Sequence, residues 1–223
     1  TPIKSSAASD VYKRQKKHNK KIFLDALATD HYYVKACLDG KTFRYSDFFV
    51  GDRPLPHPER EKMLAAWIGG PNERPNIEMA QEANGIIACL YEYYAAYQPE
   101  YADKLAYIPI PIDLSINPFH PIKSTPEVVK FFIGIQQHST AIKGTDILLD
   151  VLREIHDKYP RESHIQKVVS VPFDEYNKLL VDCHILLDQL YSYTPATNAL
   201  AAMARGIICL LYTSPSPRDI SGS

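Results

Sequence analysis

One stretch near the C-terminal end combines an apolar run, an irregular loop and a short helix. Residues 184–187 have the length and apolar character of a buried strand, and Asp188 follows at its polar end. Thr197 or Asn198 can cap the alanine-rich helix that follows, and Gly206 suits the left-handed position after its last turn. Such a helix start directs free N–H groups and a positive dipole end at the loop. The pattern therefore indicates either an anion site or an ordinary α/β crossover.

Strands and helices alternate along the rest of the chain, which is typical of an α/β fold with parallel sheets. We expect strands at 20–27, 86–90, from 105, 128–135, 167–171, 184–187 and 207–211. We expect helices at 59–68, 75–83, 91–97, 145–158 and 174–182. Open parallel sheets bind ligands at the carboxyl ends of their strands. That rule selects three loops, 28–31, 136–144 and 188–198. The apolar segment 32–38 is short, and its pattern does not distinguish a helix from a strand.

Composition excludes several classes of protein. The 223 residues carry a formal net charge of −1, which gives no electrostatic case for nucleic acid binding. No apolar run reaches the roughly 18 residues of a membrane-spanning helix, and the N-terminus lacks a signal peptide's apolar segment. The four cysteines lack metal-site spacing, which predicts reduced thiols, no metal and a cytoplasmic protein: Cys37, Cys89, Cys183 and Cys209.

The chain divides into segments of different character. Residues 1–15 and 212–223 are small and polar, with no periodic pattern, and both resemble translated adaptor sequence rather than native protein. A pair of native disordered tails is the alternative. Between these ends we predict an N-terminal domain at 16–113, a proline-rich linker at 114–127 and a C-terminal domain at 128–211. We expect the natural protein to be longer at both ends, so that both domains are incomplete.

The order of several motifs resembles the retaining glycosyltransferases of family four. Lys143-Gly144 after a buried strand is similar to the family's Lys-Gly loop, and 200–206 is similar to its Leu-Glu-Ala-Met-Ala-x-Gly motif. The segments 18–48, 85–113 and 186–206 most resemble a subgroup from bacterial polysaccharide loci. The resemblance implies a GT-B-like architecture, with two Rossmann-like domains. It also implies transfer of a hexose from a nucleoside diphosphate sugar, the substrate, to a glycan or lipid-linked acceptor.

The resemblance also assigns roles to particular residues. The donor side would use Lys143 at the diphosphate, together with Gly144, Tyr193, Thr197, Asn198 and Ala199. Such a site contains no metal and no cofactor, because cations and helix N-termini stabilise the leaving group. On the acceptor side, Asp30 and His31 would orient the acceptor or relay a proton. As alternatives, Lys143 is a solvated helix-start lysine, and Asp30-His31 is a solvent-exposed loop pair.

The sequence departs from the family where carboxylates are expected. Family members usually carry two glutamates at the positions of Tyr193 and Ala201, and an arginine before the Lys-Gly pair that is missing here. Each loss removes a charged hydrogen bond worth roughly 1.5–3 kcal/mol. Asp188 either supplies a carboxylate from a displaced position or is an ordinary carboxylate at the end of a strand. Two other functions therefore stay open, a catalytically degenerate module that binds a glycan or a partner protein, and a nucleotide-sugar epimerase.

The expected partners follow from the first function. They are the nucleotide-sugar donor and the glycan or lipid-linked acceptor, with contact at the inner face of the membrane left open. In this interpretation the full-length protein is the active enzyme, and the fragment alone is inactive.

Overall fold

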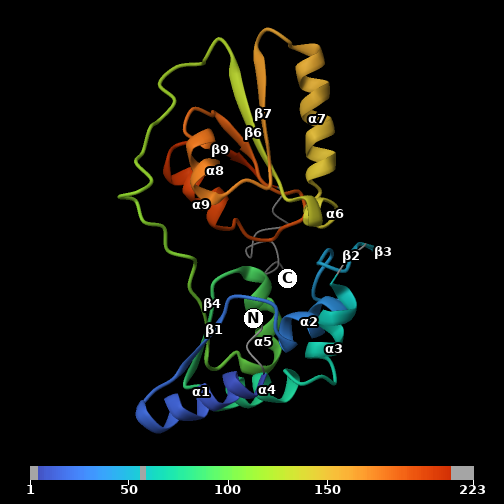
Figure 1. Ribbon diagram of the computed structural model, residues 1–223, viewed down its shortest axis with the longest axis vertical. Helices are drawn as coiled ribbons and strands as arrows, with labels where there is room; N and C mark the ends of the chain where they lie inside the picture. Colours follow the sequence, from blue (N-terminus) through green and yellow to red (C-terminus); the bar gives the residue numbers. More distant parts are fainter. Residues whose placement is uncertain (1–4, 56–58, 212–223) are drawn as a thin grey trace, which may run out of the picture. The chain divides into compact units, whose positions relative to one another are not determined.

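A computed structural model describes residues 5–55 and 59–211 (Figure 1). The chain forms two compact units, each considered by itself. Unit 1 comprises Thr1–Gly51 and His57–Ile110, and unit 2 comprises Asp52–Pro56 and Pro111–Ser223. The predicted tail 212–223 lies outside the described residues. None of the described helices is both long enough and apolar enough to cross a membrane.

Unit 1 contains a parallel three-stranded sheet of order β1-β4-β5. Its strands are β1 (Phe23–Ala26), β4 (Gly85–Ala88) and β5 (Leu105–Tyr107). The helices are α1 (Ser5–His18), α2 (His31–Leu38), α3 (Arg60–Trp67), α4 (Glu73–Glu82) and α5 (Tyr91–Tyr101). A short pair, β2 (Phe49–Val50) and β3 (Arg53–Pro54), forms a separate two-stranded sheet.

One prediction for this part of the chain was wrong. The segment 28–31 is not entirely loop, because His31 is the first residue of α2, which extends to Leu38. The apolar segment at 32–38 is thus a helix, with Tyr32, Val34 and Cys37 buried. Residues 5–15 lie in α1, although their sequence shows no periodic pattern.

Unit 2 contains a parallel four-stranded sheet of order β7-β6-β8-β9. Its strands are β6 (Val129–Ile135), β7 (Ser163–Val169), β8 (Ile185–Leu187) and β9 (Ile208–Leu210). The helices are the 3₁₀ turn η1 (Gln137–Ser139), α6 (Thr140–Lys143), α7 (Thr145–Lys158), α8 (Phe173–Leu180) and α9 (Thr197–Ala204). Helices alternate with parallel strands in both units, so the α/β class and the Rossmann-like layers are confirmed.

The two faces of this sheet are covered by different helices. Phe132 packs with Leu180 of α8 and Ala202 of α9, whereas its neighbour Ile133 packs with Leu149 and other α7 residues. Successive strand residues point to opposite faces, so one strand supplies both cores. Figure 1 shows α7 on one side of the strands and α8 and α9 on the other.

The segment 111–127 packs on unit 2 through polar contacts with the end of α9. Arg205 donates from Nε to Oδ1 of the buried Asn117 at 3.0 Å, and the Arg205 carbonyl accepts from the His120 N–H at 2.9 Å. Much of the predicted linker is therefore held by unit 2.

Candidate functional site

A polar pocket of about 230 Å³ opens in unit 2 at the carboxyl ends of β6, β7 and β8. This is the edge at which open parallel sheets bind ligands. The strands and helices that surround it supply Gly134, Ile135, Gln136, Lys143, Val168, Ser170, Val171, Phe173, Tyr176, Asp188 and Asn198. Lys143 and Asn198, both predicted as donor-binding residues, thus line one pocket.

Lys143 is positioned by contacts of its side chain and of its backbone carbonyl. It ends α6, and its Nζ donates to Oε1 of Gln136 at 3.1 Å. Its carbonyl accepts from the N–H of Leu190 at 2.8 Å and from the N–H of Tyr191 at 3.4 Å. These bonds tie the loop before α7 to the loop after β8.

Gly144 makes this arrangement possible. It has φ +65°, the left-handed conformation that glycine adopts most readily. A Cβ there would come within 2.8 Å of Cβ of Leu190. Gly144 occupies the N-cap position of α7, and no side chain forms a cap hydrogen bond there.

The loop after β8 brings Asp188 and the start of α9 to the pocket. Burial raises the pKa of the Asp188 carboxyl, and the nearby Lys143 opposes that rise. No hydrogen bond reaches the Asp188 carboxylate from any residue that the structure describes.

The start of α9 differs from the predicted cap. Ala196 is the N-cap residue and Thr197 is the first helical residue, with no side-chain cap. The first backbone bond runs from the Leu200 N–H to the Ala196 carbonyl at 3.0 Å, which leaves the N–H groups of residues 197–199 without backbone acceptors in the described chain. The Ala199 side chain is fully buried, so only its N–H could meet a ligand. Tyr193 is not among the lining residues.

Sequence reasoning missed the wall of the pocket that follows β7. Ser170 has φ +48°, uncommon for a residue other than glycine, and its N–H donates to the Ile135 carbonyl at 3.0 Å. Tyr176 covers Gly134, where an added Cβ would come within 2.7 Å of the Tyr176 Cε2 atom. Strained residues gather at binding sites, and a glycine inside a strand marks a close approach. Gly134 was the available sequence signal.

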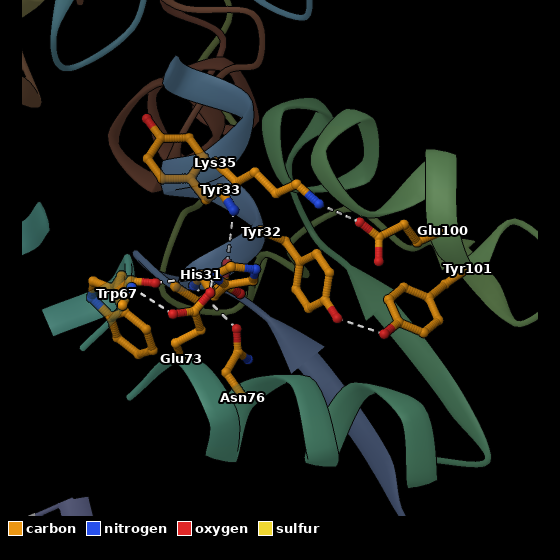
Figure 2. Close-up of polar contacts among 11 residues, drawn as sticks. His31, Tyr32, Tyr33, Lys35, Trp67, Glu73, Asn76, Glu100 and Tyr101 are labelled. Atoms are coloured by element: carbon orange, nitrogen blue, oxygen red, sulfur yellow. Dashed lines mark hydrogen bonds and ion pairs between the residues drawn. The ribbon is translucent and has the colours of Figure 1, made fainter. Parts of the chain in front are cut away.

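Asp30 and His31 are both buried and lie in a polar network of unit 1. Figure 2 shows the contacts of His31 in this network. Asp30 is the N-cap of α2: its Oδ1 accepts from the Tyr33 N–H at 2.9 Å, and its Oδ2 accepts from the Tyr97 hydroxyl at 2.6 Å. Burial raises the pKa of the Asp30 carboxyl, and the two hydrogen bonds oppose that rise. Asp30 therefore has a structural partner for each of its oxygens.

His31 connects α2 with two other helices. Its backbone N–H donates to Oδ1 of Asn76 at 3.1 Å, and its Nδ1 lies 2.9 Å from the Trp67 carbonyl, so Nδ1 carries a proton. The same nitrogen lies 3.5 Å from Oε1 of Glu73. The His31 residue is only 6% exposed. The alternative of a solvent-exposed pair is thus wrong, whereas the acceptor role of the two residues stays a prediction.

The comparisons with known proteins give no family. The chain matches no protein-family model and no curated protein significantly.

The described residues contain no group of three or more His, Cys, Asp or Glu side chains arranged to hold a metal ion. Their four cysteines are free. Burial raises the pKa of the Cys183 and Cys209 thiols to about 11, so both stay protonated near neutral pH. The pocket of unit 2 offers the Lys143 amine, the Asp188 carboxyl and free N–H groups, together with the polar side chains of Gln136, Ser170, Tyr176 and Asn198.

Proposed function

We propose that this chain is part of a GT-B-like retaining glycosyltransferase that transfers a hexose from a nucleoside diphosphate sugar to a glycan or lipid-linked acceptor. In this proposal the pocket of unit 2 takes the donor diphosphate. The observation that carries it is the presence of Lys143 and Asn198 in one polar pocket at the carboxyl edge of a parallel sheet.

The chemistry of the pocket suits a diphosphate leaving group. Negative charge grows on that group as the glycosidic bond breaks, and fixed positive charge stabilises it. Lys143 supplies a full charge, and the start of α9 supplies N–H groups that have no backbone acceptors. The contact between Lys143 and Gln136 holds the ammonium group at the wall of the pocket.

A catalytically degenerate module that binds a glycan or a partner protein without turnover is the second candidate. The observation that favours it is Ala201, which is buried in α9 where the resembling family carries a glutamate. Tyr193 occupies the other position at which the family carries a glutamate. This candidate keeps the two-domain fold but performs no hexose transfer.

The test is a calorimetric titration of the protein with UDP, GDP and ADP, followed by assays with the corresponding hexose donors. One charged hydrogen bond contributes about 1.5–3 kcal/mol, so Lys143→Ala should weaken diphosphate binding roughly 10- to 150-fold. The control is Lys158→Ala, which removes an equal charge at the far end of α7 and should leave binding unchanged.

Absence of binding to all three diphosphates would refute the donor pocket. Equal losses in the two lysine variants would point to a general charge effect instead. Binding without hexose transfer, in a version of the protein with both domains complete, would favour the degenerate module.

A further inference from the structure

Two carboxyls in this chain, the buried Asp30 and the half-buried Asp188, have opposite surroundings. Asp30 accepts hydrogen bonds on both oxygens, from Tyr33 and Tyr97. Asp188 lines the pocket of unit 2 and receives no hydrogen bond from the described residues. Because Asp188 is half-buried and lines the pocket, its acceptor oxygens are available to hydrogen-bond donors of a ligand.

Asp188 shares its pocket with one cationic side chain, that of Lys143. Lys143 lines the same pocket, but its Nζ bonds to Gln136, and within the described chain it forms no ion pair with Asp188. The pocket therefore presents a cation and a carboxyl that are close together but not engaged with each other. A ligand that matches both must carry an anionic group and hydroxyl donors.

We propose that Asp188 accepts hydrogen bonds from adjacent hydroxyl groups of a phosphorylated sugar whose phosphate is bound by Lys143. The inference rests on the proposed function and deepens it by assigning the residue that recognises the sugar hydroxyls. A carboxylate has two acceptor oxygens, which fit the two hydrogens of a vicinal diol. Bonds to a charged acceptor are also stronger than neutral ones.

The vicinal diol has two possible sources, the ribose of the nucleotide and the transferred hexose. Three probes distinguish them: UDP carries only the ribose, glucose 1-phosphate carries only the hexose, and pyrophosphate carries neither. Each is titrated into the wild-type protein, into Asp188→Ala and into the isosteric Asp188→Asn. Asp174→Asn, an exposed carboxyl at the start of α8, serves as the matched control.

We expect Asp188→Ala to weaken binding of one hydroxyl-bearing probe by about 10-fold or more. Pyrophosphate should bind the variant at least as well as the wild type, because a negative charge near its site has been removed. The probe that loses affinity identifies the ring that Asp188 contacts. Asp188→Asn should fall between wild type and Asp188→Ala, and Asp174→Asn should match the wild type.

Three results would overturn the inference. Unchanged binding of both UDP and glucose 1-phosphate would show that Asp188 contacts no ligand hydroxyl. An equal loss for pyrophosphate, in both Asp188 variants, would show that Asp188 only maintains the shape of the pocket. Failure of the wild-type protein to bind any of the three probes would refute the proposed function as well. The first two results, by contrast, would refute only the role of Asp188.

Discussion

At the scale of single residues, Asp30 has a protein partner for each of its oxygens, and its acceptor role stays a prediction. It was predicted to act on an acceptor, whereas its oxygens hold Tyr33 of α2 and Tyr97 of α5. Burial raises its pKa above the ordinary value of 3.8. A raised pKa means that the folded state binds this proton more tightly than the unfolded state does. Its contribution to stability is therefore fully present below pH 3.8 and is lost as pH rises through the folded-state value.

Asp30→Asn removes that titration while keeping a good N-cap residue. The free energy of unfolding of the variant relative to the wild type should therefore increase as pH rises from about 3.5 to 7. Urea unfolding at a series of pH values measures it. Asp25→Asn, at an exposed position of β1, is the control and should show no such trend. A difference that is independent of pH in Asp30→Asn would contradict the assignment.

At this scale the sequence predicted residues that belong to local motifs, but not contacts between residues far apart in the chain. Lys143 and Asn198 were both marked by local motifs, and both line the pocket. The partner of Asp30 could not be predicted, because Tyr97 lies 67 positions away and no local pattern links them. Ser170 also carried no signal, since its left-handed backbone follows from how its loop crosses the end of β6.

At the scale of elements, strong amphipathic patterns were predicted best. The helix 145–158 has an apolar stripe and corresponds to α7, and the apolar run 128–135 corresponds to β6. α2 was missed because its segment is rich in aromatic residues and has no polar stripe, and because Asp30 was not identified as its cap. In this case tertiary packing decided the conformation.

Gly206, which ends α9, has φ +86°, and an added Cβ would come within 2.9 Å of Phe119 and 3.2 Å of the His120 carbonyl. We expect Gly206→Ala to lower the free energy of unfolding by more than the roughly 1–2 kcal/mol of left-handed strain alone. Gly40→Ala is the control for that strain, because Gly40 has φ +65° with no atom within 4 Å. Urea unfolding followed by circular dichroism measures both. Equal losses of unfolding free energy in the two variants would show that Phe119 moves aside without an energetic cost.

At the scale of the whole molecule, the sheet of unit 2 has β9 as an edge strand, to which another chain could pair. β9 pairs only with β8 in the described chain, and Ile208 and Leu210 are 52% and 50% exposed. Unpaired edge strands with apolar side chains template pairing with other chains. We therefore expect the protein as given to self-associate through β9.

Replacing Ile208 and Leu210 with lysine should reduce that association, because edge lysines oppose strand pairing. Light scattering over a concentration series measures it. The control replaces Ile147 and Val151, which are 42% and 45% exposed on α7, with lysine. That pair adds the same charge away from a strand edge and should have a smaller effect. Equal effects would identify total charge as the cause.

The double contact on the Lys143 carbonyl has a consequence for protein engineering. Because Leu190 and Tyr191 both donate to this one oxygen, the segments 136–144 and 188–198 form a single structural cassette. Gly144 leaves room for Leu190 at the join. A chimera that grafts one of these segments from another protein, to alter ligand preference, would separate the halves of this cassette. Productive grafts must carry both segments together.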